Sequence, residues 1–552
     1  MLTQATAANP RHLAGRFAVV LLAAATILAA CGSSGDDSGA SGGSSTTAAS
    51  AKLPALDNVN IRLEGDWPHL DPTGRTPGGG LQTQVLTNLL YDSLVVIGPD
   101  PKDPKKPILL PYLAESWDST PSKVSFKIKK GVTCADGTPV TPSVVKRNVD
   151  VRIEAKTGVA QSYGAGPFET VADDAAGTFT LNLGSPYYDA LYAFIELRIV
   201  CPAGLDNGGS IVNGAAGSGP YTLVSAEHGN QAVLKRREDW KWGPNGITAK
   251  DIPAQVTAKV ITNETTAANL LLTGGLDVSK VGGADVPRLK GDKSLVNATT
   301  VSFYNNTLIF STDPAHPTAD KVVRQALSTA IDRDSWNQAA NQGRGTPSTS
   351  FLQPKADCYE PKTKDLAPKN PSPDAARKIL TDAGWTAGAN GKLQKNGQPL
   401  TVILVSTTIT GLGNGGEYLA AQWDKAGITV DTRITGDYNT FLQRGIKGEF
   451  DALTTNYPFD QPNPNRAVGT YTGPVASSWS KGPTPEIDAE INLAQQNEGA
   501  KRCEHWAKVQ TMLLQGFNIY PLASPEVNWF TKGITIFPGA SWSNPIYYRR
   551  AK

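Results

Sequence analysis

The chain has 552 residues and a formal net charge of only +2, with 52 Lys and Arg against 50 Asp and Glu. This balance excludes a nucleic-acid binder and a polybasic lipid binder, because such proteins concentrate Lys and Arg on one face. The length allows two to four domains or one large multi-lobed body, and 54 Gly, 39 Pro and 11 Trp favour a loop-rich body over a helical bundle.

The first fifty residues have the pattern of an export signal followed by a tether. Two arginines precede an uncharged run, 17–30 (FAVVLLAAATILAA), which is shorter than the roughly 20 residues of a membrane-spanning helix. The run ends in Leu-Ala-Ala-Cys31, which resembles the lipobox of bacterial lipoproteins. We therefore expect 1–30 to be a signal peptide, Cys31 to carry a lipid and the Gly/Ser-rich segment 31–51 to be a flexible tether. The alternative is an ordinary secretory signal with an incidental cysteine.

Alternating residues predict strands in the first half of the body. Residues 59–63 and 178–183 are expected to be strands, and so is 124–129, where Val124, Phe126 and Ile128 fall on one face. Residues 82–96 begin as a helix and end in an apolar, strand-like run. The Pro- and Lys-rich stretch 100–111 is expected to be a loop.

The second half predicts alternating helices and strands. Asp320 is expected to cap one helix, and Ser372-Pro373 to begin another that ends near Gly384. A β-rich run at 401–405, a Gly-rich turn, a helix and an alternating run at 428–434 form a βαβ unit, whose strands should be parallel. The fold class is therefore α/β. The helix that Asp320 is expected to cap has an apolar stripe, which consists of Val323, Ala326, Leu327, Ala330 and Ile331.

Two motifs look catalytic but occur in the wrong context. Residues 411–416 read GxGxxG between a strand and a helix, yet a dinucleotide site belongs in the first βα unit, and nicotinamide cofactors are intracellular. Ser143 and Lys146 match SxxK, and 156–158 match KTG, but these motifs are ten residues apart and no SDN occurs. From residue 52 to the C-terminus no GxSxG, HExxH or P-loop is present, so we expect no enzyme and no cofactor.

Four cysteines remain when Cys31 is set aside, an even number that suits an oxidising compartment. Disulfides are expected, with three connectivities open, and four free buried thiols are the alternative. A metal site is not expected, because no CxxC or HxxxH spacing occurs and the histidines are scattered. The four are Cys134, Cys201, Cys358 and Cys503.

Short segments follow one another in a characteristic order from about Leu63 to the C-terminus. They are LDP at 70–72, YDSL at 91–94, LAESW at 113–117, FKIKKGV at 126–132 with DGTPV at 136–140, GSGPY at 217–221 with DW at 239–240, VRQAL at 323–327 with AID at 330–332, 373–385, FDA at 450–452 and IYPL at 519–522. This order resembles the extracellular solute-binding protein family 5, the peptide, nickel and oligosaccharide receptors of ABC importers. The chain departs from the family pattern at 308–311 and at 456–457, which bears on the ligand.

The resemblance implies a periplasmic-binding-protein-like class II fold, with two hinged lobes and an additional domain inserted in the first. Domain I would comprise 52–100, 212–312 and 518–552, domain II 101–211 and domain III 313–517. This arrangement favours the disulfides Cys134–Cys201 and Cys358–Cys503, because each pair then stays within one lobe.

The resemblance also implies where a ligand would bind. In peptide-binding members an aspartate after the FDA strand pairs with the ligand's α-amino group, and Asp460 stands at the matching position. A cap for the turn that follows is the alternative role for Asp460. The other candidate pocket residues, for which packing is the alternative, are Tyr457, Asn456, Trp67, Tyr304 and Trp479.

The expected function is that of a substrate-binding lipoprotein on the outer face of the cell membrane. It would capture an extracellular solute, an oligopeptide before other polar solutes, and deliver it as a monomer to an ABC permease with ATPase subunits. The alternatives are an exported serine-type or dinucleotide-dependent enzyme and a surface signalling or structural lipoprotein on the same fold.

Overall fold

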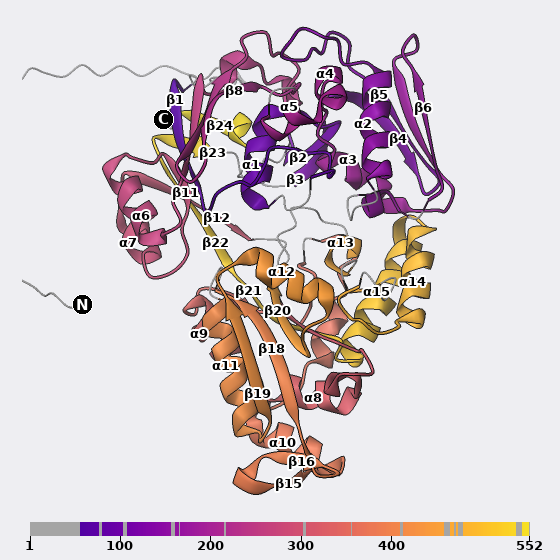
Figure 1. Cartoon of the computed structure of the whole chain (residues 1–552), viewed down its shortest axis with the longest axis vertical. Coiled ribbons are helices and arrows are strands. Elements are labelled where there is room, and N and C mark those ends of the chain that lie inside the picture. The colour runs from indigo at the N-terminus through magenta and orange to yellow at the C-terminus, as the bar shows by residue number, and fades with distance from the viewer. Residues whose placement is uncertain are drawn as a thin grey trace, which may run out of the picture. The chain divides into compact units, whose positions relative to one another are not determined.

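The structure is a computed structural model of the whole chain (Figure 1). It describes residues 56–76, 80–102, 107–155, 160–164, 166–214, 217–301, 305–354, 356–408, 412–456, 464–468, 471–472, 478–536 and 544–550. All of them belong to one compact unit, Leu53–Lys552. The expected signal peptide, Cys31 and the expected tether up to residue 51 lie outside the described residues.

A mixed seven-stranded sheet contains strands from both ends of this unit. β1 pairs in parallel with β10 and β11, while β9 and β22 pair antiparallel with their neighbours. Helix α1 (Leu81–Leu90) follows β1, and α6 (Glu264–Thr273) and α7 (Val286–Gly291) accompany β11. The strands in sheet order are β12 (Leu295–Val301), β22 (Glu526–Lys532), β11 (Val278–Lys280), β1 (Asn58–Leu63), β10 (Gln255–Val260), β9 (Gln231–Arg236) and β8 (Tyr221–Glu227).

A four-stranded antiparallel sheet is built from residues 114–183, between β1 and β8 in the chain. As the alternation predicts, Val124, Phe126 and Ile128 are buried on one face of β5. The sheet is accompanied by α2 (Pro142–Glu154), η2 (Tyr188–Tyr192), α3 (Ala193–Glu196), α4 (Pro202–Asp206) and α5 (Gly208–Val212). The strands in sheet order are β4 (Ala114–Thr120), β5 (Lys123–Ile128), β7 (Thr178–Leu183) and β6 (Phe168–Asp173).

The expectation of a loop throughout 100–111 is wrong. Residues Pro107–Pro111 form β3, which pairs antiparallel with β2 (Val95–Pro99). The two prolines stand at the ends of the strand, where a missing N–H costs little, and the apolar residues between them can pair.

A six-stranded sheet lies in the second half, with the predicted βαβ unit at one edge. β18 and β19 are parallel and joined by α11 (Leu412–Lys425), which packs on both. Asp320 and Ser372 cap α8 (Lys321–Thr329) and α10 (Pro373–Asp382) through their side chains, as the sequence predicts. The strands in sheet order are β14 (Thr346–Pro347), β21 (Ile519–Ser524), β13 (Asn306–Phe310), β20 (Ala452–Asn456), β18 (Thr401–Thr407) and β19 (Thr429–Thr435).

The remaining elements surround these three sheets (Figure 1). Helices α9 (Arg333–Asn341), α12 (Tyr438–Lys447), α13 (Pro464–Val468), α14 (Pro485–Gln495) and α15 (Gly499–Gln515) belong to the second half. A small three-stranded sheet consists of β15 (Thr386–Ala387), β16 (Leu393–Lys395) and β17 (Gln398–Pro399). A two-stranded sheet consists of β23 (Ile534–Ile536) and β24 (Tyr548–Arg550).

Most of the Gly-rich run 411–416, which is expected to be a turn, instead begins α11. Gly413, Gly415 and Gly416 lie buried inside the first turns of the helix. A Cβ atom on Gly415 would come within 2.8 Å of the Trp336 ring, and one on Gly416 within 3.0 Å of Ser406 on β18. These glycines therefore allow the helix to pack closely, and they are not arranged as a phosphate-binding turn.

The hydrophobic interior is divided between the two halves of the chain. One continuous cluster contains residues from the four-stranded sheet and from β1, β8, β9 and β10 of the seven-stranded sheet. Two other clusters lie on the two sides of the six-stranded sheet and contain only residues between 308 and 523. The four-stranded sheet is thus packed firmly onto the seven-stranded one, while the six-stranded sheet has cores of its own.

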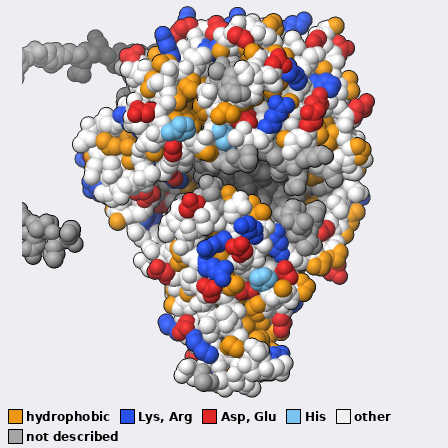
Figure 2. All heavy atoms as spheres, in the orientation of Figure 1, with side chains coloured by type: hydrophobic (Ala, Val, Ile, Leu, Met, Phe, Trp, Pro, Cys, Tyr) orange, Lys and Arg blue, Asp and Glu red, His pale blue; other side chains and the backbone are white. Residues whose placement is uncertain are grey.

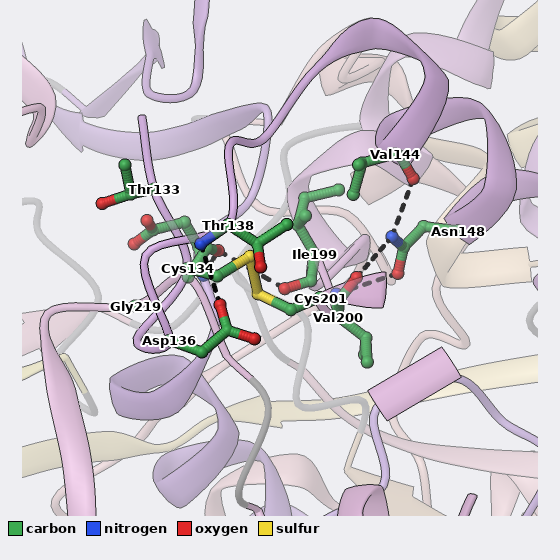
Figure 3. The surroundings of a disulfide bond; sticks show 12 residues. Thr133, Cys134, Asp136, Thr138, Val144, Asn148, Ile199, Val200, Cys201 and Gly219 are labelled. Carbon is green, nitrogen blue, oxygen red and sulfur yellow. Dashed lines mark hydrogen bonds between the residues drawn. A yellow bond between two sulfur atoms is a disulfide. The ribbon is translucent and has the colours of Figure 1, made fainter. Parts of the chain in front are cut away.

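Disulfides link Cys134 to Cys201 and Cys358 to Cys503, the two pairs that the sequence analysis favours. Around the first disulfide, the buried side chain of Asn148 on α2 donates to the carbonyl oxygen of Val200 and accepts from its N–H (Figure 3). The distances are 2.8 and 2.9 Å. This two-way contact holds the residue before Cys201 against α2.

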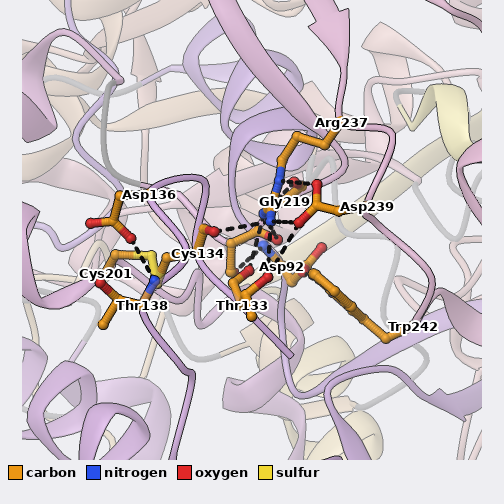
Figure 4. A network of polar contacts seen from close by, with 11 residues as sticks. Asp92, Thr133, Cys134, Asp136, Thr138, Cys201, Gly219, Arg237, Asp239 and Trp242 are labelled. Atoms are coloured by element: carbon orange, nitrogen blue, oxygen red, sulfur yellow. Dashed lines mark hydrogen bonds and ion pairs between the residues drawn. A yellow bond between two sulfur atoms is a disulfide. The ribbon is translucent and has the colours of Figure 1, made fainter. Parts of the chain in front are cut away.

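The guanidinium of Arg237, just after β9, ties the same region to the seven-stranded sheet (Figure 4). It donates to the carbonyl oxygens of Thr133, Cys134, Ser218 and Gly219 at 3.0–3.4 Å. It also forms a 2.7 Å ion pair with Asp239, although its own side chain is only 5% exposed. The carbonyl oxygen of Cys134 also accepts from the N–H of Gly137, but Arg237 is the donor for those of Thr133, Ser218 and Gly219, which come from two chain segments.

A buried carboxyl group, Asp92, lies beside this network (Figure 4). Tyr112 donates to one carboxylate oxygen and the indole N–H of Trp242 donates to the other, the latter at 2.7 Å. Burial raises the pKa of Asp92 to about 6, and these hydrogen bonds together with the charge of Arg237 only partly oppose the rise.

We expect Arg237→Met to lower the free energy of unfolding by about 3 kcal/mol, because it leaves several buried carbonyl groups without a donor. Urea unfolding of the mature chain measures the change. The neighbouring Arg236 is the matched control, since it pairs mainly with the exposed Glu238. Arg236→Met should cost about 1 kcal/mol or less, and equal losses in the two variants would contradict this role for Arg237.

Candidate functional site

The chain passes twice between the seven-stranded and the six-stranded sheet. It leaves β12 at Val301 and enters β13 at Asn306, and it returns from Ser524 at the end of β21 to Glu526 in β22. Val301 pairs with Glu526 and Asn306 with Ala523, so the two connections run side by side. Two adjacent connections of this kind are the structural basis of a hinge.

A hollow lies beside these connections. Figure 2 shows the surface hollowed between the region of β3 and the region of α12, and Figure 1 places β12 and β22 at one side of it. We call this hollow the cleft. Sites between two lobes are common positions for ligands, because groups from both sides can converge there.

A network of buried carboxamide and hydroxyl groups joins the two connections. The side-chain amide of Asn305 donates to the carbonyl oxygen of Ser350. The amide of Gln353 donates both to the Oδ1 atom of Asn305 and, at 2.7 Å, to the Oγ atom of Ser524. The network thus links the outgoing connection, the loop after β14 and the returning connection through side chains that are all buried.

A second row of carboxamides continues from Asn306. Its Nδ2 atom lies 3.5 Å from Asn341 Oδ1, Asn341 donates to Asn337, and Asn337 donates to the carbonyl oxygen of Gly345. A Cβ atom on Gly345 would lie 2.3 Å from Asn337 Oδ1 and 2.9 Å from the carbonyl oxygen of Ser524, so only glycine fits. The Oδ1 atom of Asn306 is buried and has no hydrogen-bond donor among the residues that the structure describes. It can accept a hydrogen bond from an N–H or O–H group.

The carboxyl ends of the parallel strands β1, β10 and β11 carry a charged group. Glu64, after β1, forms a 2.8 Å ion pair with Lys280 at the end of β11. Burial opposes the ionisation of Glu64, but the charge of Lys280 and its hydrogen bond prevail, so the pKa of Glu64 is lowered. Arg344, from the half that contains the six-stranded sheet, donates at 2.6 Å to the carbonyl oxygen of Gly283 in the loop after β11.

β20, which contains the end of the FDA segment, runs toward the same connections. Its last residue, Asn456, pairs with Asn306 at the beginning of β13. At the other end of the strand, the buried carboxylate of Asp451 accepts from the N–H of Ile403 and contacts His316 Nδ1 at 2.7 Å. This hydrogen bond raises the pKa of His316, which burial would lower. Asp451 therefore fixes the strand from which the segment 457–463 continues.

Among the predicted pocket residues, the structure places only Asn456 at the connections. Asp460, Tyr457 and Tyr304 lie outside the described residues. Asn456 lies at the end of β20, as stated above, and the structure does not describe its side chain.

The two tryptophans among the candidates lie in separate hydrophobic clusters. Trp67, in the loop after β1, is buried with its ring 5.1 Å from that of His228. Trp479 is buried in a cluster of the second half and meets Phe441 edge-on at 6.5 Å.

The sequence analysis missed the carboxamide network. Asn305, Gln353 and Ser524 carry no recognisable motif, and Gln353 and Ser524 are 171 residues apart in the chain. The one local signal was the Asn305-Asn306 pair directly before the apolar run of β13.

The motif that resembles a serine enzyme is not assembled as one. Lys146 forms a 2.6 Å ion pair with Asp150 on the same helix. The N–H of Ser143 donates to Asp174, as expected of a residue in the first turn of a helix. KTG at 156–158 lies outside the described residues.

Neither a metal-binding cluster nor a membrane-spanning helix occurs in the described ranges. No three His, Cys, Asp or Glu side chains in these ranges are grouped so that they could hold a metal ion. None of the helices in the same ranges is long and apolar enough to cross a membrane.

Comparisons with known proteins agree with this architecture. The chain is similar to a substrate-binding protein from Microbacterium hydrocarbonoxydans, solved with 4-hydroxybenzoate hydrazide, with a TM-score of 0.74 and 24% identity, covering 90% of this chain and 100% of that one. It is also similar to the oligopeptide-binding protein AppA of Bacillus subtilis, solved with a nonapeptide, with a TM-score of 0.74 and 18% identity, covering 91% and 100%. The fold is that of two-lobed solute-binding proteins with an additional inserted domain.

Sequence comparison identifies the family within this class. The periplasmic oligopeptide-binding protein OppA of Salmonella typhimurium is 25% identical over 442 residues, which cover 75% of this chain and 78% of that protein. The model of the bacterial extracellular solute-binding proteins, family 5 Middle, matches residues 109–479. The chain belongs to this family, whose members are solute-binding proteins.

The contact between His316 and Asp451 should make the stability of the protein depend on pH. Because the folded pKa of His316 is raised above its usual 6.5, its contribution is full below that value and is lost as the pH rises through the folded pKa. We expect the difference in unfolding free energy between the natural chain and His316→Gln to shrink as the pH rises from about 6 into the alkaline range. Urea unfolding across this range measures it, and a difference that grows with pH would contradict the assignment.

Proposed function

We propose that the chain captures an extracellular oligopeptide between its two lobes and delivers it to an ABC permease. The buried carboxamide network beside the two connections is the observation that carries the proposal. A carboxamide offers the same kinds of donor and acceptor as a peptide bond, and the buried Asn306 Oδ1 atom needs a donor such as a peptide N–H. Two of the three compared proteins are named or solved as peptide binders.

The lobes of the proposed receptor correspond to the two divisions of the hydrophobic interior. Domains I (52–100, 212–312 and 518–552) and II (101–211) would form one lobe, in keeping with the cluster that their sheets share. Domain III (313–517) would form the other lobe, in keeping with its own clusters. The two side-by-side connections would then serve as the hinge about which the lobes close.

Asp460 is the proposed partner of the ligand's α-amino group. It follows β20 by four residues, and β20 ends beside Asn306 at the connections, which supports this proposal. A carboxylate that faces an ammonium group compensates the cost of removing both charges from water. Tyr457, Asn456 and Tyr304 are proposed to line the same pocket.

The proposed function involves no chemical reaction. The ion pair between Lys146 and Asp150 and the buried glycines of α11 leave neither of the look-alike motifs in a catalytic arrangement. Permeases read the difference between open and closed receptors, so binding and closure are sufficient for this role.

A defined pool of oligopeptides should raise the melting temperature of the mature protein, because a ligand that binds only the folded state stabilises it. At about 100 times the dissociation constant, the stabilisation is about 2.7 kcal/mol. Differential scanning fluorimetry measures the shift, with sugar and nickel pools run in parallel. A shift with sugar or nickel alone would overturn the peptide assignment.

The same measurement with Asp460→Asn tests the proposed amino-group partner. The variant should weaken binding of free-amine peptides more than binding of their N-acetylated forms, because only the former carry the charge that Asp460 would neutralise. Asp431→Asn is a matched control, because Asp431 is an exposed carboxylate paired with Arg433 on the edge strand β19. Equal losses for the two peptide forms would remove the role of Asp460.

We further propose that a lipid on Cys31 holds the monomeric receptor at the outer face of the membrane. The Leu-Ala-Ala-Cys sequence after an apolar run and the Gly/Ser-rich segment after it support this proposal. A flexible segment of about 20 residues spans a root-mean-square distance of about 25 Å, which leaves the receptor room to open and dock.

Cys31→Ala should release the protein from the membrane fraction while leaving its affinity for ligand unchanged. The reason is that the lipid anchors the chain without contributing to the binding site. Membrane fractionation and mass spectrometry of the N-terminus measure anchoring and modification. Retention of Cys31→Ala on the membrane would contradict the assignment.

A further inference from the structure

A buried polar contact joins the inserted four-stranded region to the second half of the chain, away from the two connections. Asp189, in η2, accepts at 2.8 Å from Arg502 on α15 and at 2.8 Å from Gln495 on α14. Its N–H also donates to Gln495 at 3.2 Å. The Asp189 and Arg502 side chains are 2% and 4% exposed, so the ion pair is almost completely removed from water.

Neighbours of Asp189 extend the contact along η2. The guanidinium of Arg502 lies over the ring of Tyr188 at 4.7 Å. Tyr192 donates to Asp357 at 3.2 Å, and Asn465 donates to the hydroxyl of Tyr187 at 2.6 Å. Side chains from one short segment thus meet four separate segments of the other half: the loop before η6 (Pro361–Leu366), α13, α14 and α15.

The second disulfide lies next to the residues of the second half that contact η2. Arg502 lies next to Cys503, which is bonded to Cys358, and an Nη1 atom of Arg502 lies 3.3 Å from the Cys358 sulfur. Gln510 on α15 donates to the carbonyl oxygen of Cys358 at 2.8 Å. The cross-link and this hydrogen bond hold Asp357 and Arg502 on one surface, where both face η2.

The position of the contact bears on how the cleft opens. Figure 1 shows α14 and α15 at the side of the molecule opposite β12 and β22. At one side, then, the two halves are joined through the chain itself, and at the other side by side-chain contacts alone. Any hinge motion about the two connections must separate Asp189 from Arg502.

The chemistry of the contact makes it reversible. Ala190 and Leu191 of η2 belong to the hydrophobic cluster of the first lobe, while apolar residues of α14 and α15 belong to a cluster of the second. Among the described residues, no hydrophobic cluster includes both sides of the contact. The attraction within a buried ion pair is largely offset by the cost of removing both charges from water, and separation returns both to water. Arg502 Nε is moreover buried without a partner, which lowers the net gain further.

We propose that Asp189, Gln495 and Arg502 form a closure latch that sets how fast the solute leaves the closed receptor. This inference rests on the proposed function, because only a protein that captures a solute needs a closed state that lasts. The hydrogen bonds fix one relative position of the lobes through their directions, while the small net energy of the buried pair allows release.

Arg502→Met and Asp189→Asn test the latch in the mature protein, with Arg324→Met as the matched control. Arg324 is also a buried arginine, but the carbonyl groups it binds, those of Thr318, Ala319 and Gly516, all belong to the second half of the chain. It therefore reports the general cost of removing a buried guanidinium. Small-angle X-ray scattering of the ligand-free variants and stopped-flow release of a bound fluorescent peptide are the two measurements.

We expect both latch variants to have a larger radius of gyration than the natural chain and to release the peptide roughly tenfold faster, which corresponds to the loss of a charged hydrogen bond. The double variant should add little to either single one, because the two residues act as a pair. Arg324→Met should lower the unfolding free energy without changing scattering or release. Scattering and release that match the natural chain, or changes equal to those of Arg324→Met, would overturn the latch.

The scattering measurement separates this proposal from the proposed function. It needs no ligand, so it supports or overturns the latch even if no peptide binds the protein. Opening in Arg502→Met with no response to any peptide would keep the latch and overturn the peptide assignment. If the variants bind peptide and their scattering and release are unchanged, the peptide assignment is kept and the latch is overturned.

Discussion

The arrangement of the whole molecule depends on the chain crossing between its two large sheets only at two adjacent places within the described residues. Adjacent connections restrain translation but leave rotation about one axis comparatively free, which is the geometry of a hinge. The separate hydrophobic clusters on the two sides follow the same division, since a shared core would resist rotation. The contacts described between the two halves are therefore made by polar groups. Each of these groups can replace its hydrogen-bond partner in the protein with water or with a ligand.

The inserted four-stranded region, in contrast, is packed firmly against the seven-stranded sheet. It shares a hydrophobic cluster with the seven-stranded sheet, and Arg237 joins carbonyl groups on both sides of their boundary. The two parts consequently move as one body, and this gives η2 a fixed position from which to reach α14 and α15. A contact that exists in the closed form and is lost in the open form contributes its energy directly to the difference between them, so small changes in that energy alter the population of the closed form.

The sequence predicted those features that are encoded locally. Alternating residues identified β5, and the side chains of Asp320 and Ser372 marked the beginnings of α8 and α10, because capping and alternation involve only near neighbours. It failed for β3, where flanking prolines masked a short pairing, and for the glycines of α11, whose purpose depends on Trp336 far away in the chain.

The candidate site was predicted less well, because it too depends on contacts between segments that are distant in the chain. A segment order indicated the family and the neighbourhood of β20, but the carboxamide network joins Asn305, Gln353 and Ser524 from three distant segments. Nothing local distinguishes such residues from surface polar ones. Only the pairing of β13 with β20 and β21 brings them together.

The position of Cys503 next to Arg502 has a consequence for when the receptor becomes competent. Disulfides persist in oxidising compartments and are rare where thiols are kept reduced. Before export, the segment that carries Asp357 would lack its covalent link to α15, and the surface that meets η2 would be incomplete. For the exported receptor proposed above, oxidation would thus complete this surface in the same compartment where the solute is found.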